Sequence, residues 1–173
     1  MNKMKIASVS IIIVTVVAIV IVYFCNKPLS KNIDTTVIGV QFRINGSPED
    51  CELIAITIKG TAKYFLFGNR VGYYEGWFSI EGYDYTFKRI VSFELRNECT
   101  AFNPLWYPYN NSSNLLGNIC TTDLEEFIIY IYETDNYGHI QWGYDSSYII
   151  CAPANDKEEA VGVLANLCGY GTY

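Results

Sequence analysis

A single histidine limits the acid–base chemistry open to this chain. His139 is the only histidine among the 173 residues, so any proton transfer by an imidazole must use it. A cysteine thiolate beside a base is a nucleophile, and Cys151 belongs to the same expected hairpin as His139. Cys151 also stands between Ile150 and Ala152, a setting typical of a small, buried apolar side chain. We therefore expect neither residue to be catalytic.

Neighbouring carboxylates are the second candidate chemistry. They occur as Glu49/Asp50, Glu125/Glu126 and Glu133/Asp135. Glycoside hydrolysis needs two carboxyl groups roughly 5 to 9.5 Å apart across a cleft. Each pair here flanks a turn or a strand start, where a solvated charge is the ordinary outcome. We assign no catalytic residue, and we keep a hydrolase that uses Cys151 or paired carboxylates as the alternative to a binding protein.

Motifs for metals and cofactors are absent from the sequence. There is no Cys-x-x-Cys pair, and with one histidine a zinc site of ordinary spacing is not expected. The calcium loop of EF-hands, the phosphate loop and the dinucleotide glycine motif are missing too. We expect no metal and no cofactor.

Five cysteines follow the N-terminal apolar run: Cys51, Cys99, Cys120, Cys151 and Cys168. Because five is odd, at least one thiol stays free unless it pairs outside the domain. Cys99 and Cys120 are the most attractive disulfide pair since they bracket one long expected loop. A bridge there would contribute about 3 kcal/mol by restricting the unfolded chain. A fully reduced set of thiols stays open as the alternative.

Aromatic side chains give the strongest binding signal in the chain. The candidates are predicted on an outward strand face or in the long loop, and they are Trp77, Trp106, Tyr107, Tyr109 and Trp142. Exposed rings on a rigid sheet bind sugars, peptides or other proteins, and Trp and Tyr are enriched at binding hot spots. The alternative is that most of these rings belong to the core or cover the second face of the sheet.

The first apolar run, Ile6 to Phe24, positions everything that follows. It has 19 residues without a charge, and as a helix it would be roughly 28 Å long, close to the hydrocarbon thickness of a bilayer. It exceeds the apolar region of a cleaved signal peptide and ends without a small-residue cleavage site. Lipidation of Cys25 is a weaker alternative, because Phe24 is bulky. We predict a single-pass signal anchor over residues 6–24.

Charge and length define the parts on either side of this run. We expect a cytoplasmic tail over residues 1–5, a linker over 25–34 and a globular domain over 35–173, placed outside the cytoplasm. Lysines flank the run on both sides, so the orientation rests mainly on the shortness of the tail. From Lys31 onward, 9 Lys and Arg face 18 Asp and Glu, a net charge of about −9. This charge argues against nucleic acid as a partner.

Alternating apolar residues predict a β-rich domain. Strands are expected over 38–44, 54–58, 62–67, 73–81, 85–95, 139–144 and 148–151. Residues 127–133 are apolar on both faces, which fits a central strand covered on both sides. Residues 100–118 contain Pro104, Pro108 and an Asn/Ser run, and we interpret them as a long loop.

One helix is expected near the C-terminus, over residues 156–168. Asn155 and Glu158 form a capping-box pattern, and Gly169 is a natural stop. Apolar residues at 160, 163, 164 and 167 give the helix one apolar face. The fold class is therefore α+β: an N-terminal transmembrane helix, a mostly antiparallel sheet arranged as a sandwich or open barrel, and one C-terminal helix.

Two short stretches resemble a pattern in small membrane-anchored proteins of Gram-positive bacteria that have no assigned activity. They are Gly76-Trp77-Phe78-Ser79-Ile80-Glu81-Gly82-Tyr83 and Ile149-Ile150-Cys151-Ala152-Pro153-Ala154. The resemblance implies a bacterial cell-envelope setting and transfers no functional residues. With the aromatic candidates, it favours a non-enzymatic envelope module that contacts the lipid bilayer and binds an envelope protein or saccharide. A domain that only assembles with other membrane proteins is a third reading.

Overall fold

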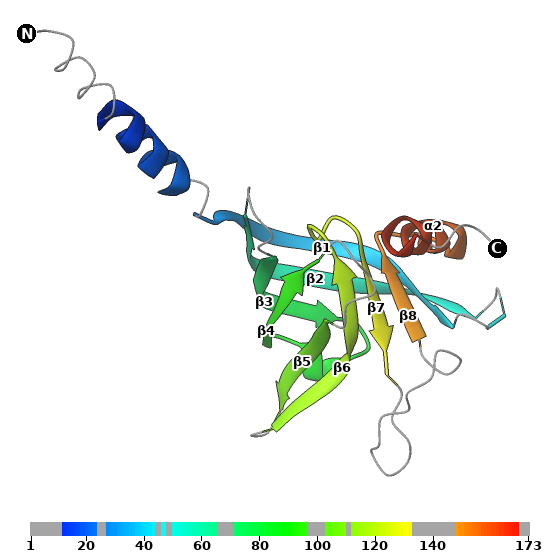
Figure 1. Ribbon diagram of the computed structural model, residues 1–173. Helices are drawn as coiled ribbons and strands as arrows, with labels where there is room; N and C mark the ends of the chain where they lie inside the picture. Colours follow the sequence, from blue (N-terminus) through cyan, green and yellow to red (C-terminus); the bar gives the residue numbers. More distant parts are fainter. Residues whose placement is uncertain are drawn as a thin grey trace, which may run out of the picture.

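The computed structural model describes residues 12–23, 27–43, 46–47, 50–65, 71–96, 103–109, 112–132 and 148–169. Eight strands precede one C-terminal helix (Figure 1). In chain order the elements are β1 Leu29–Arg43, β2 Cys51–Tyr64, β3 Gly72–Ile80, the short 3₁₀ helix η1 Asp84–Thr86, β4 Ile90–Leu95, β5 Pro104–Tyr109, β6 Ser112–Thr121, β7 Phe127–Ile131, β8 Tyr148–Ala152 and α2 Lys157–Cys168.

The strands form one antiparallel sheet in the order β4-β3-β2-β1-β8-β7-β6-β5. Strands adjacent in sequence pair with each other, except β4 and β5, and β8 pairs with β1. The sheet therefore curls into a nearly closed barrel whose seam lies between β4 and β5. The predicted antiparallel sheet with a C-terminal helix is confirmed. It takes the form of an open barrel, because one continuous sheet leaves no second sheet to build a sandwich.

Apolar side chains fill the barrel interior. Every second residue is buried on β2 (Ile54, Ile56 and Ile58) and on β4 (Val91, Phe93 and Leu95), as the alternation of apolar residues in these stretches requires. At the centre, Phe78 packs edge-on against Phe93 and Phe127, with ring centroids 5.6 and 5.5 Å apart. An eight-stranded barrel is just wide enough for side chains to fill, and this one holds a packed aromatic core.

A second, smaller core lies between the outer face of the sheet and α2. Val40, Ile128 and Cys151 on the sheet meet Ala160 and Val163 on the helix. β7 is consequently buried on both faces, as predicted. Gly169 ends α2 in the left-handed conformation, also as predicted.

The helix begins one residue later than predicted. Asp156 is the N-cap, and its carboxylate accepts a hydrogen bond from Glu159 N at 2.9 Å. Glu159 in turn accepts from Asn155 N at 2.8 Å. Asp156 and Glu159 therefore cap the helix, with Glu159 accepting from the residue before the N-cap, and the predicted capping box of Asn155 with Glu158 was wrong. The acidic run supplies good capping residues at successive positions, so the sequence pattern does not fix the register.

The prediction of a long loop over residues 100–118 was wrong as well. These residues include β5 and most of β6, which pair from Pro104 with Asn118 to Tyr109 with Ser112. Two prolines and a polar run concealed the alternation of buried Leu105 and Tyr107 with exposed Trp106. Proline is tolerated in an edge strand, and β5 is such a strand.

β1 and β2 are longer than predicted. β1 starts at Leu29, inside the stretch that we interpreted as linker, and pairs with β2 throughout. β2 continues through Gly60, where we expected a break between two strands. Gly60 pairs with Gly76 on β3, and a Cβ on Gly60 would lie 2.8 Å from the Tyr74 hydroxyl. The Tyr74 side chain therefore occupies the space that the two glycines leave.

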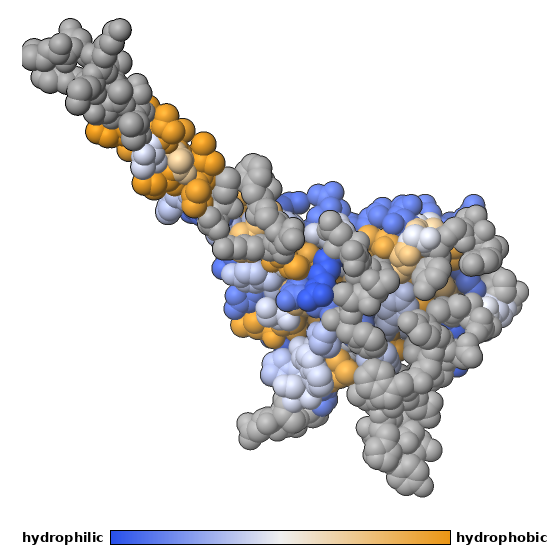
Figure 2. Space-filling model, in the orientation of Figure 1, coloured by the Kyte–Doolittle hydropathy of each residue, from blue (hydrophilic) through white to orange (hydrophobic). Residues whose placement is uncertain are grey.

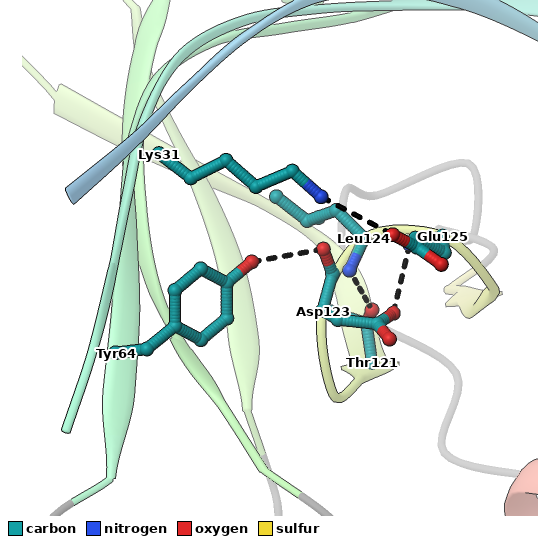
Figure 3. Close-up of polar contacts among 6 residues, drawn as sticks. All are labelled: Lys31, Tyr64, Thr121, Asp123, Leu124 and Glu125. Carbon is teal, nitrogen blue, oxygen red and sulfur yellow. Dashed lines mark hydrogen bonds and ion pairs between the residues drawn. The ribbon is translucent and has the colours of Figure 1, made fainter. Parts of the chain in front are cut away.

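Polar contacts join the turn between β6 and β7 to the strands β1 and β2 (Figure 3). Leu124, with a left-handed φ of 69°, contributes its buried side chain to the barrel core. Tyr64 of β2 donates a hydrogen bond to Asp123 O at 3.0 Å, and Lys31 of β1 reaches Glu125 at 3.1 Å. The long ends of β1 and β2 therefore hold this turn in place.

Residues 12–23 form a helix that projects away from the barrel (Figure 1). All of its residues are exposed, and it is strongly apolar (Figure 2). Within the described ranges, we find no helix with the length and apolar character needed to cross a membrane. Residues 6–11 and 24 of the predicted anchor lie outside those ranges, and the transmembrane helix stays a prediction.

Candidate functional site

Two of the five predicted aromatic residues lie on the outer surface of the barrel. Trp77 on β3 is 39% exposed and Trp106 on β5 is 47% exposed. Their nearest inward neighbours on the same strands, Phe78 and Tyr107, are completely buried. Strand alternation thus sends one large ring inward and the next outward, so both tryptophans are held on a rigid support.

The other predicted aromatic residues take different places. Tyr107 lies in the core and donates a hydrogen bond to Phe78 O at 2.5 Å. Burial, with smaller contributions from Tyr85 and Tyr74, raises the pKa of Tyr107 well above 10.0. Tyr107 therefore acts as a core residue and has no exposed area to offer a ligand. The side chain of Tyr109 and the whole of Trp142 lie outside the described residues.

Two apolar residues that the sequence analysis did not select extend the exposed surface. Ile90 on β4 pairs with Trp77 and is 60% exposed, and Phe87 in the preceding turn is exposed too. We refer to Trp77, Phe87, Ile90 and Trp106 as the outer aromatic surface. These residues come from β3, β4, β5 and the turn before β4, all at or beside the seam. Trp77 and Ile90 are neighbours by register, and large exposed apolar side chains on adjoining elements are typical of interaction sites.

Asn103 bridges the seam with its side chain. Its Oδ1 accepts a hydrogen bond from Glu94 N at 3.2 Å, and its Nδ2 donates to Glu94 O. Its own carbonyl accepts from Ile119 N on β6 at 2.9 Å. The amide group therefore makes the pair of bonds that a backbone residue of a neighbouring strand would make. This contact, together with the Tyr107 hydrogen bond, draws β5 towards β3 and β4.

Two prolines prevent β5 from completing the ladder. The carbonyl of Asn103 points to β6, so the backbone of Pro104, Trp106 and Pro108 points to the seam. Proline has no N–H, and β5 can donate to the seam only from Trp106. β4 and β5 therefore lie side by side without forming a regular strand ladder.

The charges around the seam are unevenly paired. Glu94 and Arg96 form an ion pair at one end of β4. At the other end, Lys88 lies over the Phe87 ring, 5.0 Å from its centroid. Lys88 and Arg89 are exposed and form no ion pair with a described residue. The seam therefore has a locally basic end in a domain that is acidic as a whole.

The described cysteines of the domain differ in bonding and in burial. Cys120 is disulfide-bonded, whereas Cys51, Cys151 and Cys168 are not part of a disulfide. Cys99 lies outside the described residues, so its pairing with Cys120 stays a prediction. Burial, with a smaller contribution from Cys168, raises the pKa of Cys151 to about 12. A thiol with that pKa is almost entirely protonated near pH 7, which argues against the alternative of Cys151 as a nucleophile.

The remaining candidate chemistry finds little support in the described part of the chain. His139 lies outside it. Glu125 is exposed and paired with Lys31, as expected for a solvated charge. Among the described residues, no group of three His, Cys, Asp or Glu side chains is arranged to hold a metal ion.

Asn103, Ile90 and Phe87 were missed by the sequence analysis. Ile90 starts a strand with clear alternation, in which 91, 93 and 95 are inward, so its exposure was available from the pattern. Asn103 gives no such signal, because its role depends on the approach of β4 across the seam.

No protein family model, curated protein or solved structure was found to match this chain.

Proposed function

We propose that this protein is a membrane-tethered binding module of the cell envelope, which holds a ligand or partner on the outer aromatic surface. One observation carries the proposal: Trp77 and Trp106 are exposed on rigid strands whose neighbouring rings are buried. Tryptophan is costly to leave in water and is enriched at binding hot spots. With no supported nucleophile or metal site in the described residues, binding is favoured over catalysis.

The tether in this proposal is the uncharged run over residues 6–24. Its described part, residues 12–23, is an exposed apolar helix outside the barrel, which leaves its side chains available to lipid. The disulfide of Cys120 supports a location outside the cytoplasm, because disulfides persist mainly in oxidising compartments. The bacterial setting implied by the sequence resemblance agrees with this location.

Binding assays on matched variants test the proposed function. The full chain, purified in detergent, is screened against a displayed library of random peptides and an array of bacterial cell-wall saccharides. We expect binders to be retained by the parent and lost by a variant with both Trp77→Ala and Trp106→Ala. Leu53→Ala, which removes an exposed apolar side chain from β2, is the matched control and should bind as the parent does.

Two results would contradict the proposal. Equal binding by the parent and the double variant would show that the tryptophans are not the contact surface. Failure of the parent to retain any peptide or saccharide would remove both ligand classes. Circular dichroism of each variant checks that the barrel is intact, which is expected because both tryptophans point away from the core.

A further inference from the structure

Polar side chains surround Trp77 on the outer face of the sheet. Lys59 on β2 lies directly opposite Trp77 on one side, and Ile90 on β4 lies opposite it on the other. The remaining outward neighbours on β2, β3 and β4 carry a hydroxyl or a carboxylate, and they are Thr57, Thr61, Glu75, Ser79 and Ser92. We refer to Trp77, Lys59 and these five residues as the Trp77 face. It combines one exposed ring with a polar surround on paired strands.

Contacts with β1 orient the polar side chains next to Trp77. Lys59 Nζ donates a hydrogen bond to Asp34 Oδ2 at 2.7 Å, and the two side chains are 53% and 70% exposed. The Thr57 hydroxyl forms a hydrogen bond with the Thr36 hydroxyl at 3.1 Å. An ammonium has three donors and a carboxylate about four acceptor sites, so these contacts use only part of the hydrogen-bonding capacity. A ligand hydroxyl can therefore bind here without breaking them.

The charge and polarity of the Trp77 face disfavour several ligand classes. The charges of Lys59 and Asp34 balance, which leaves the exposed carboxylate of Glu75, in a domain with 9 Lys and Arg against 18 Asp and Glu. Acidic polymers and anionic lipids would be repelled. An apolar peptide segment would cover hydroxyl and carboxylate groups without replacing their hydrogen bonds to water, which is costly. The complementary ligand is therefore uncharged and rich in hydroxyl groups.

We propose that the Trp77 face binds an uncharged saccharide, with one sugar ring lying on the indole of Trp77. One side of a sugar ring presents C–H groups, which are attracted to the negative face of an aromatic ring. The hydroxyls at its rim both donate and accept hydrogen bonds, so they match the Lys59 ammonium and the carboxylates of Asp34 and Glu75. The inference rests on the proposed function and names its ligand class, and Trp106 has no part in it.

The test measures binding of tetrasaccharides to the full chain, purified in a detergent that has no sugar headgroup. The neutral probes are tetramers of glucose, mannose, galactose and N-acetylglucosamine, and a tetramer of galacturonic acid is the charged comparison. Isothermal titration calorimetry gives the affinity, and saturation-transfer NMR identifies the sugar protons nearest the protein. We expect at least one neutral tetramer to bind through the C–H side of a ring and the acidic tetramer not to bind.

Two substitutions on the Trp77 face are compared with matched controls. Trp77→Ala should weaken binding at least about tenfold, because the stacking surface is lost. Lys59→Ala should weaken it about fivefold through a lost hydrogen bond, and it keeps the proposal testable if Trp77→Ala does not fold. Lys31→Ala removes a lysine from another exposed ion pair, and Leu53→Ala removes another exposed apolar side chain. Both controls should bind as the parent does.

The outcomes separate this inference from the proposed function. If no neutral tetramer binds, but peptides are retained by the parent and lost by the double tryptophan variant, the saccharide falls and the proposed function stands. If a neutral tetramer binds the parent, Trp77→Ala and Lys59→Ala equally, the Trp77 face falls. Equal binding of the acidic tetramer would overturn the restriction to uncharged sugars. Binding weakened in Trp77→Ala and Lys59→Ala, and kept in both controls, is the result that we expect.

Discussion

Replacing Asn103 tests how the barrel is held together at its seam. The side chain is 6% exposed and makes two hydrogen bonds to the backbone of Glu94, one as acceptor and one as donor. Asn103→Ala removes both and leaves the N–H and carbonyl of Glu94 without a partner in a partly buried place. At roughly 0.5 to 1.5 kcal/mol for each hydrogen bond, the free energy of unfolding should fall by about 2 kcal/mol.

Urea unfolding of the full chain in detergent, followed by tryptophan fluorescence, measures this change. The matched control is Asn114→Ala on β6, because Asn114 is exposed and a surface substitution of this kind should change stability by less than about 0.5 kcal/mol. Asn103→Asp is informative as well. It keeps the acceptor for Glu94 N but turns the donor into an oxygen facing Glu94 O. It should therefore be destabilising at pH 7.

Hydrogen exchange locates the effect within the barrel. In Asn103→Ala, the amide of Glu94 should exchange faster, whereas amides in the β1–β2 pairing should not change. A free energy of unfolding within about 0.5 kcal/mol of the parent would refute the reasoning, because the loss of two hydrogen bonds at a partly buried seam should lower it by more than that. Equal losses for Asn103→Ala and Asn114→Ala would also refute it.

Four substitutions and one pH series test other parts of the fold. Gly76→Ala should destabilise the domain by more than about 2 kcal/mol, because the new Cβ would lie 2.5 Å from the backbone of Gly60. A Cβ at Gly162 would meet open space, so Gly162→Ala should stabilise α2 by roughly 0.5 to 1 kcal/mol. Urea unfolding measures both changes. Burial raises the pKa of Cys151 from 9.0 to about 12, so the folded state holds this proton more tightly than the unfolded state. The contribution of Cys151 to stability should therefore be constant below pH 9 and decrease between pH 9 and about 12, which unfolding curves at several pH values would detect. Tyr64→Phe should lower the free energy of unfolding by about 1 kcal/mol, because the hydrogen bond to Asp123 O is lost. Lys31→Ala should leave the urea midpoint unchanged, because the ion pair of Lys31 is exposed.

Alternation made most of the sheet predictable from the sequence. Ile54, Ile56 and Ile58 on β2, and Val91 with Phe93 on β4, point inward as the period of two requires. The apolar run of β7 correctly indicated cover on both faces, and the acidic start and glycine end of α2 placed that helix to within a residue. These are local signals, because the type of each residue depends on the burial and backbone position of that residue alone.

The seam was not predictable in this way. β5 contains two prolines in six residues, a composition that resembles a loop until the partner strand β6 is known. Tyr107 was expected at the surface and is in the core, because the interpretation as a loop removed the alternation that separates it from Trp106. Asn103 acts on a strand that is adjacent in space only because the barrel curls, which no local pattern records.

The position of the two prolines explains how the barrel is held at its seam. Both face the seam, so within β5 only Trp106 can donate a backbone hydrogen bond in that direction. Side chains make the contacts across the seam instead: the Asn103 amide bonds the backbone of Glu94, and the Tyr107 hydroxyl bonds Phe78 O. Charged residues bracket β4, with Lys88 and Arg89 at one end and the Glu94–Arg96 pair at the other, and charges at a strand edge oppose uncontrolled pairing. Trp77 and Trp106 lie on the outer faces of the strands that these contacts hold together, so the seam contacts also position the proposed binding surface.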